Sequence, residues 1–419
     1  MKIIIDNKIP FIQGALEPFA EVVYLPGAEI SAADVKDADA MIVRTRTKCN
    51  AALLDGSKVK FIATATIGFD HIDAGYCEKN NIIWTSAPGC NSFSVQQYIA
   101  STLLNIANDE VFSLKDKTLG IVGVGNVGSK VAKFAETMGM KVLLNDPPLQ
   151  AGLKGELAGS LDFSMTEAPG PSEIDSAGAS VLLNSDSQVS SIKHQVSNQF
   201  VSLEQIKNES DFITFHVPLN REGEYSTFHM VDETFLCDVR NSTWIFNSSR
   251  GEVVDNAAIK QALQDKKIAG AVLDVWENEP QINLELMKLA KFATPHIAGY
   301  SADGKANGTS MSVQVLSKFF GLEIDDWQAE SVPVPEGNTL TIDCENKTLE
   351  DVMSTAILAT YDIKGDDGRL RNSPETFEKQ RGDYPLRREP LAFKIELVND
   401  SANFAESLNE MRFHLMLDA

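Results

Sequence analysis

The sequence predicts an α/β protein with two Rossmann-like, doubly wound domains and a small α+β domain at the C-terminal end. Three observations support this prediction: a length of 419 residues, short β-branched apolar runs that alternate with helical stretches, and a glycine-rich turn between a strand and a helix. A chain of this length exceeds one ordinary domain. Strands that alternate with helices indicate parallel sheets covered by helices.

The first segment contains the runs expected of one such sheet. Each run is short, apolar and rich in β-branched residues, and polar helical stretches separate them; the runs are KIIID, EVVYL, ADAMIVRT, VKFIATAT and IIWTSA. The stretch SFSVQQYIASTLLNIAND then has helical spacing. We expect this helix to carry the chain into a second domain.

The second domain repeats the pattern. It opens with KTLGIVGVGNVGSKVAKFAETMGMKVLLNDPP, and later strands are expected at DFITFHVP, STWIFNSS, AGAVLDVW and KFATP. Residues 155–199 differ in composition: they are rich in Ser, Gly and Pro and lack clear hydrophobic periodicity. They are therefore expected to form a long loop. After the proline-containing linker ESVPVPEGN, strands are predicted at TLTIDC and FKIELV, with helices around TLEDVMSTAILATYDI and FAESLNEMRFHLM.

Composition narrows the class of protein. A net charge of −22 and a pI near 4.7 argue against nucleic acid as a partner, which requires a positive field. No apolar run has membrane-spanning length, and the N-terminus lacks the pattern of a signal peptide, so a cytoplasmic protein without membrane contact is expected. The five cysteines are scattered without a C-x-x-C pair, and no metal site is predicted.

The glycine-rich turn has the spacing of a dinucleotide-binding site. Gly123, Gly125 and Gly128 follow a strand and open a helix, the context that gives each glycine a role at a pyrophosphate. Asp146 ends the next strand, where a carboxylate accepts hydrogen bonds from ribose hydroxyls and repels a 2′-phosphate. The predicted cofactor is therefore NAD, and we expect Asn126 and Val127 of the same turn to contact it.

Three further stretches follow strands of this domain: NSSRGEVVD, LDVWENEP and TPHIAGYS. They supply a cation, a carboxylate and an imidazole at the edge of the sheet where ligands bind. Hydride transfer from a 2-hydroxy acid requires a base for the hydroxyl proton, a partner that fixes the base, and a cation for the substrate carboxylate. Arg250, Glu279 and His296 are the candidates.

With the glycine turn, these stretches make the chain similar to the D-isomer-specific 2-hydroxyacid dehydrogenases. The resemblance implies that His296 is the acid and base, that Glu279 hydrogen-bonds it, and that Arg250 holds the substrate carboxylate, a task suited to a planar guanidinium. Glu277 is the rival carboxylate, but the family motif places the residue before Pro280 in this role.

The resemblance also assigns binding residues. Thr45, Thr66 and Tyr300 match substrate-contacting positions, and the NAD-contacting positions are Val217, Ser248, Ser249, Asp274 and Gly299. Val217 departs from close relatives, which often have threonine there. For a substrate phosphate the candidate cations are Arg44 and Arg46, or from the C-terminal domain Arg369, Arg371, Arg387 and Arg388.

The resemblance extends over nearly the whole chain to one branch of the family, through VRTRTK, TATIGFDHID, APGCNS, TPHIAGYSADGKANG and the C-terminal segment. It implies a substrate domain of residues 1–98 and 300–332, an NAD-binding domain of residues 99–299, and a dimerisation domain of residues 337–419. The implied activity is oxidation of 4-phospho-D-erythronate in pyridoxal 5′-phosphate biosynthesis by a homodimer. The alternatives are a dehydrogenase of another 2-hydroxy acid, such as 3-phosphoglycerate, and an NAD-sensing binding protein of the corepressor type.

Overall fold

The computed structural model describes residues 1–158 and 200–416. Its internal contacts divide the described residues into two units: residues 1–91 with 301–333, and residues 92–158 with 200–300 and 334–416. The loop predicted over residues 155–199 lies outside the described residues from position 159 onward. Residues 155–158 belong to helix α6 (Pro147–Ala158), so the loop prediction is wrong for them.

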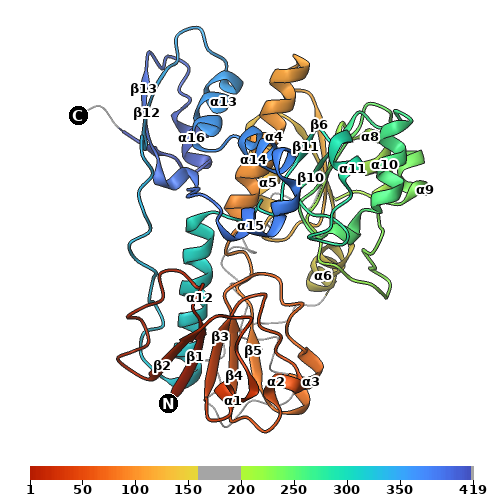
Figure 1. Ribbon diagram of the computed structural model, residues 1–419. Helices are drawn as coiled ribbons and strands as arrows, with labels where there is room; N and C mark the ends of the chain where they lie inside the picture. The colour runs from red at the N-terminus through yellow and green to blue at the C-terminus, as the bar shows by residue number, and fades with distance from the viewer. Residues whose placement is uncertain (159–199, 417–419) are drawn as a thin grey trace. The chain divides into compact units, whose positions relative to one another are not determined.

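The first unit contains a parallel sheet of five strands, drawn in red and orange in Figure 1. The order across the sheet is β2 (Glu21–Leu25), β1 (Lys2–Asp6), β3 (Ala40–Val43), β4 (Phe61–Thr64) and β5 (Ile83–Thr85). Helices α1 (Ala32–Val35), α2 (Ala51–Leu54) and α3 (Ala74–Lys79) pack on one face, and α12 (Ala302–Phe320) packs on the other.

Alternation along the strands explains this arrangement. In β1, Ile4 packs in the core beneath α1 to α3, while Ile3 and Ile5 pack in the core that includes Val313 and Leu316 of α12. Successive side chains of a strand point to opposite faces, and both faces of a parallel sheet are buried. The continuous apolar runs of this segment therefore form strands covered on both sides.

The second unit contains a parallel sheet of six strands. The order is β11 (Phe292–Ala293), β10 (Gly270–Leu273), β9 (Trp244–Asn247), β8 (Phe212–Phe215), β6 (Thr118–Val122) and β7 (Lys141–Asn145). From β6 the chain first moves outward to β7 and then returns to β8 on the other side. This reversal is the topological switch point at which open α/β sheets bind their ligands.

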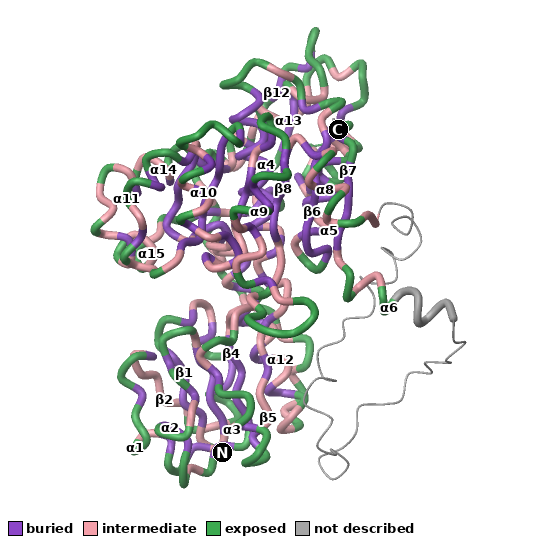
Figure 2. The backbone as a smooth tube through the Cα atoms, turned by 90° about the vertical axis from the view of Figure 1, so that its right-hand side faces the viewer, coloured by how far each residue is buried: buried purple, intermediate pink, exposed green. Residues whose placement is uncertain are grey.

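Helices cover both faces of this sheet, whose central strands are buried along their length (Figure 2). One face packs against α4 (Ser92–Glu110) and α5 (Gly128–Thr137). The other face packs against α8 (Leu203–Glu209), α9 (Glu233–Asp238), α10 (Asn256–Gln264) and α11 (Leu284–Leu289).

The C-terminal segment adds a small parallel sheet of β12 (Thr339–Asp343), β13 (Lys394–Val398) and β14 (His414–Leu415). Its helices are α13 (Leu349–Thr360), α14 (Ile363–Asn372), α15 (Phe377–Gly382) and α16 (Ala405–Glu410). The predicted helix over FAESLNEMRFHLM is wrong at its end, because β14 pairs there with β13, a distant segment that local periodicity does not reveal.

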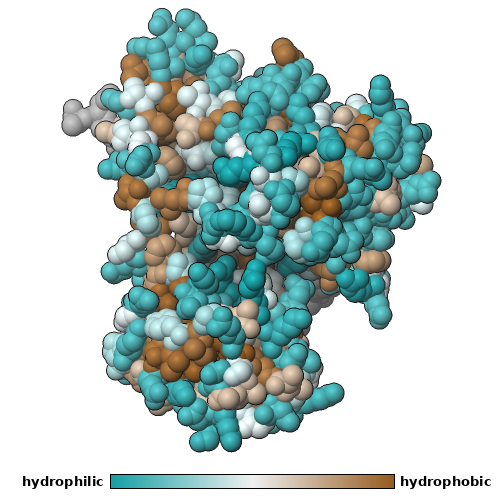
Figure 3. Space-filling model, in the orientation of Figure 1, coloured by the Kyte–Doolittle hydropathy of each residue, from teal (hydrophilic) through white to brown (hydrophobic). Residues whose placement is uncertain are grey.

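The predicted fold class is confirmed: two doubly wound parallel sheets and a small α+β segment. Helices α13 and α14 pack against α4, and the C-terminal segment is accordingly part of the second unit (Figure 1). The face shown in Figure 3 is covered largely by hydrophilic residues, as the high net charge predicts.

Candidate active site

The residues predicted for the cofactor and the chemistry in the second unit follow the carboxyl ends of its strands. Gly123 follows β6, Asp146 follows β7 and Val217 follows β8. Arg250 follows β9, and the loop with His296 follows β11. Parallel strands place these loops along one edge of the sheet, on both sides of the switch point between β6 and β8.

The three glycines of the turn are required for different reasons. Gly123 has φ +89°, and an added Cβ would lie 2.5 Å from the carbonyl oxygen of His216. A Cβ on Gly128 would lie 2.0 Å from the carbonyl oxygen of Gly123. A Cβ on Gly125 would meet no heavy atom of the described chain within 4 Å. Packing within the protein therefore requires glycine at positions 123 and 128. Gly125 instead leaves open space next to exposed backbone.

Asp146 is tied to the glycine turn by its own carboxylate. One oxygen accepts a hydrogen bond from the amide of Val124 at 2.8 Å, and the other accepts from the amide of Leu149 at 3.0 Å. The side chain is half-buried, so a carboxylate oxygen keeps further acceptor capacity for ribose hydroxyls. The open space at Gly125 and the fixed carboxylate both fit NAD.

The loop of Arg250 is organised by a buried amide. Asn247, the last residue of β9, donates from Nδ2 to the carbonyl of Arg250 at 2.8 Å and accepts from the amide of Ser249 at 3.1 Å. The hydroxyl of Ser248 is buried and has no hydrogen-bond partner among the described residues. A buried hydroxyl without a hydrogen-bond partner is uncommon in proteins. The Ser248 hydroxyl can therefore form a hydrogen bond with a ligand bound at this loop.

His296 and Glu279 form the pair that the sequence predicted. Nδ1 of His296 lies 2.8 Å from Oε2 of Glu279, whose Oε1 accepts from the amide of Trp276 at 3.0 Å. Burial raises the pKa of Glu279, whereas the hydrogen bond and the positive charge of His296 lower it. Together the lowering effects are larger, so the pKa lies below its ordinary value. The carboxylate is therefore ionised and fixes the imidazole through Nδ1.

The rival carboxylate has a different partner. Oε1 of Glu277 lies 2.6 Å from Nε2 of His229, and Oε2 accepts from the amide of Asn256 at 3.1 Å. The geometry therefore selects Glu279 as the partner of His296.

Asp274 has a role that the sequence did not indicate. Its Oδ1 accepts from the hydroxyl of Thr294 at 2.7 Å and from the amide of Ile297 at 2.8 Å, and its Oδ2 accepts from the amide of Ala298 at 2.9 Å. Asp274 is 1% exposed, and its carboxylate binds the backbone of the loop that contains His296. Contact between Asp274 and NAD stays a prediction.

Tyr300 closes the same loop beside the C-terminal segment. Its ring meets that of Tyr384 edge-on at 5.8 Å, and the guanidinium of Arg381 lies 5.7 Å from its centroid. Gly299, next to it, is half-buried. Their contacts with substrate and cofactor stay predictions.

The residues of the first unit that are predicted to contact the substrate also follow strand ends. Thr45 follows β3 and is exposed. Thr66 follows β4; its hydroxyl donates to the carbonyl of Gly68 at 2.9 Å and lies 2.8 Å from the hydroxyl of Thr64. The same Thr64 hydroxyl lies 3.0 Å from Nε2 of His71, whose pKa burial lowers to about 4.

Two of the arginines considered for a phosphate have other roles. Arg387 is 5% exposed and donates to backbone carbonyls of the second unit. Arg371 donates to the carbonyls of Met287 and Ala290 at 2.8 and 2.7 Å. Protein carbonyls thus engage both guanidinium groups, and phosphate binding by Arg371 or Arg387 stays a prediction.

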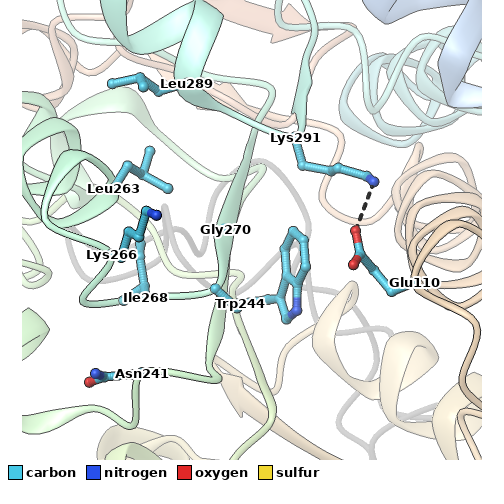
Figure 4. Close-up of a pocket in the computed structure, with 10 residues that line it drawn as sticks. Glu110, Asn241, Trp244, Leu263, Lys266, Ile268, Gly270, Leu289 and Lys291 are labelled. Carbon is cyan, nitrogen blue, oxygen red and sulfur yellow. Dashed lines mark hydrogen bonds and ion pairs between the residues drawn. The ribbon is translucent and has the colours of Figure 1, made fainter.

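A surface pocket of about 490 Å³ lies elsewhere, at the amino ends of β9 and β10 (Figure 4). Trp244 and Gly270, the first residues of these strands, line it, and Lys291 pairs there with Glu110 at 3.1 Å. The opposite edge of the sheet carries the predicted site, and none of the predicted residues lines this pocket.

Residues 1–158 and 200–416 contain no group of three or more His, Cys, Asp or Glu side chains arranged to hold a metal ion. Within the same ranges, none of the helices combines the length and apolar character needed to cross a membrane.

The chain is similar to known proteins in its NAD-binding domain and in its fold. Residues 96–167 and 172–298 match the family described as D-isomer specific 2-hydroxyacid dehydrogenase, NAD binding domain, and residues 332–411 match a domain of unknown function. The D-lactate dehydrogenase of Aquifex aeolicus, solved with NAD and lactic acid, has a similar fold, with a TM-score of 0.57, 24% identity and coverage of 78% of this chain and 97% of that one. The fold and site thus define an NAD-dependent 2-hydroxyacid dehydrogenase.

Similarity over the whole length is more specific. Erythronate-4-phosphate dehydrogenase of Bacteroides fragilis strain YCH46 is 45% identical over 95% of this chain and 100% of its own length. The enzyme of that name from Proteus mirabilis is 36% identical, with 99% of both chains covered. The chain belongs to the erythronate-4-phosphate dehydrogenase family. The sequence-based prediction of this family and of NAD as its cofactor is confirmed.

Proposed function

We propose that the protein oxidises 4-phospho-D-erythronate at C2 with NAD and forms 3-hydroxy-2-oxo-4-phosphobutanoate, in pyridoxal 5′-phosphate biosynthesis. The observation that carries the proposal is the His296–Glu279 pair, at the carboxyl edge of a dinucleotide-binding sheet. The similarity to enzymes named erythronate-4-phosphate dehydrogenase, over nearly the whole chain, supports the choice of substrate.

The proposed chemistry assigns one task to each residue. Glu279 holds Nδ1 of His296, and Nε2 accepts the proton of the C2 hydroxyl as the C2 hydride leaves. Arg250 binds the substrate carboxylate through its guanidinium. In the reverse direction His296 returns the proton to the C2 oxygen. NAD, when bound, supplies the hydride acceptor.

The binding residues are proposed by resemblance to the family. Thr45, Thr66 and Tyr300 contact the substrate. NAD contacts the glycine turn, including Asn126 and Val127. It also contacts residues that follow the other strands of the sheet: Asp146, Val217, Ser248, Ser249, Asp274 and Gly299. Val217 contacts the cofactor through its backbone, because its side chain has no hydroxyl.

We also propose a domain organisation and an oligomeric state. Residues 1–98 with 300–332 form the substrate domain, 99–299 the NAD-binding domain and 337–419 a dimerisation domain of a cytoplasmic homodimer. Sedimentation of the full chain measures the oligomeric state directly, and a monomer at micromolar concentration would contradict this part.

The substrate assignment is tested with a panel. NADH formation at mildly alkaline pH is followed with 4-phosphoerythronate, 3-phosphoglycerate and D-glycerate, the last of which lacks the phosphate. The proposal predicts the highest kcat/KM for 4-phosphoerythronate. A preference for another acid would retain the reaction class and reject the substrate. NAD binding without turnover of any acid would indicate an NAD-sensing protein instead.

A further inference from the structure

The loop that carries His296 lies between two buried groups of opposite charge. The amides of Ile297 and Ala298 donate to the carboxylate of Asp274 at 2.8 and 2.9 Å. The carbonyls of the same two residues accept from Nη1 of Arg387 at 3.4 and 3.2 Å. Two consecutive residues thus direct their N–H groups toward the carboxylate and their C=O groups toward the guanidinium.

Arg387 comes from the C-terminal segment and is 5% exposed. Its Nε donates to Oε1 of Gln97 at 3.0 Å, and its Nη2 donates to the carbonyl of Ser94 at 2.5 Å. The guanidinium carbon lies 3.7 Å from the ring centroid of Tyr361. A buried guanidinium is tolerated only where hydrogen bonds replace its hydration, and these contacts supply them.

The backbone of His296 requires such support. The residue has φ +56°, in the left-handed region that a side chain disfavours, and its amide donates to the carbonyl of Asp274 at 2.7 Å. A residue stays in this region only when its surroundings hold it there. Asp274 binds the amides that follow His296. Arg387 binds the carbonyls of Ile297 and Ala298, the second of which also accepts from the hydroxyl of Ser94 at 2.9 Å.

We infer that Arg387 is a positioning residue for the reaction, which fixes the carbonyls of Ile297 and Ala298 and thereby the direction of the His296 ring. The inference rests on the proposed function in one respect, that His296 exchanges the proton. Lysine cannot replace arginine here, because one ammonium group does not reach Gln97, Ser94 and two loop carbonyls at once. The geometry of the catalytic histidine therefore depends on the C-terminal segment.

The test compares Arg387→Lys with a matched control, Arg371→Lys, both in the full-length chain. Arg371 also lies in the C-terminal segment and binds the carbonyls of Met287 and Ala290, which precede β11 and lie outside the His296 loop. Each substitution removes a contact between guanidinium and carbonyls within the same unit. Only the first removes hydrogen bonds to the loop of His296.

Two kinds of measurement are made on each variant: the pH profile of kcat with KM for NAD, and amide hydrogen exchange of residues 294–300. For Arg387→Lys we expect kcat to fall by about 10-fold to 100-fold, as misplacement of a reacting group does, with a shifted pH profile, faster loop exchange and little change in KM for NAD. Arg371→Lys is expected to keep the pH profile and the loop exchange of the unaltered protein.

Equal pH profiles and equal loop exchange in the two variants would overturn the inference, since Arg387 would then stabilise the fold without directing His296. If Arg387→Lys does not fold, Gln97→Met leaves the guanidinium in place and removes the acceptor of its Nε, together with the hydrogen bonds that Gln97 donates to the hydroxyl of Thr360 and the carbonyl of Arg388. This variant must change the loop exchange and the pH profile in the same direction. If the unaltered protein oxidises no 2-hydroxy acid, the proposed function fails, and hydrogen exchange still decides whether Arg387 holds the loop.

Discussion

Nδ1 of His296 lies 2.8 Å from Oε2 of Glu279, and the second oxygen of this carboxylate accepts from the amide of Trp276. The carboxylate is thus bound on one side to the backbone after β10 and on the other to the imidazole. In the proposed reaction, this relationship leaves Nε2 as the ring nitrogen that exchanges a proton with the substrate.

We expect Glu279→Gln to lower kcat by about 10-fold to 100-fold, because the amide neither stabilises the imidazolium by charge nor enforces the orientation of the ring. KM for NAD should change little. Steady-state kinetics with Glu277→Gln as control checks this, since Glu277 bonds His229 instead. Equal losses of kcat in the two variants would reject the role of Glu279.

The lowered pKa of Glu279 has a consequence for stability. Because the folded protein favours the carboxylate, this contribution is fully present above the ordinary pKa of about 4.5 and is lost as the pH falls through the folded value. The difference in free energy of unfolding between the unaltered protein and Glu279→Gln should therefore shrink from pH 7 to pH 4. Urea unfolding measures it, and a difference independent of pH would contradict the linkage.

The glycine turn allows a test that separates binding from folding. Gly128→Ala should destabilise the protein, because its Cβ would lie 2.0 Å from a backbone oxygen. Gly125→Ala should fold normally and weaken NAD binding by at least about 10-fold, since the methyl group fills the space of close backbone approach. Thermal unfolding and NAD titration check the pair. Unchanged NAD affinity of Gly125→Ala would remove this turn from the cofactor site.

Asp146 is expected to select NAD over NADP. Asp146→Asn keeps an acceptor for the amide of Val124 but loses the charge that repels a 2′-phosphate. KM for NAD should rise about 10-fold, and discrimination against NADP should decrease, with kcat nearly unchanged. If the ratio of kcat/KM for the two cofactors stayed the same, another residue would set the preference.

The sequence predicted those features that depend on local pattern. The strands of both doubly wound sheets are continuous apolar runs, and Gly123, Gly125 and Gly128 occur at a fixed spacing between a strand and a helix. The motif adjacent to Pro280 selected Glu279, and the structure pairs this residue with His296.

Other features depend on contacts between distant segments, which no local pattern reveals. Strand β14 exists because it pairs with β13, and Arg387 is buried because Ser94, Gln97 and the loop after His296 surround it. Asp274 resembled a cofactor ligand by its place after β10, and only the three-dimensional structure showed both of its oxygens bound to the loop.

The central claim is that His296 exchanges the substrate proton, and the most direct measurement is kcat for NADH formation by His296→Asn beside its dissociation constant for NAD. We predict a loss of kcat of about 100-fold to 10,000-fold with an unchanged dissociation constant, because general acid and base catalysis contributes this much and the cofactor contacts remain. A variant that binds NAD normally and keeps kcat within about threefold of the unaltered protein would contradict the account.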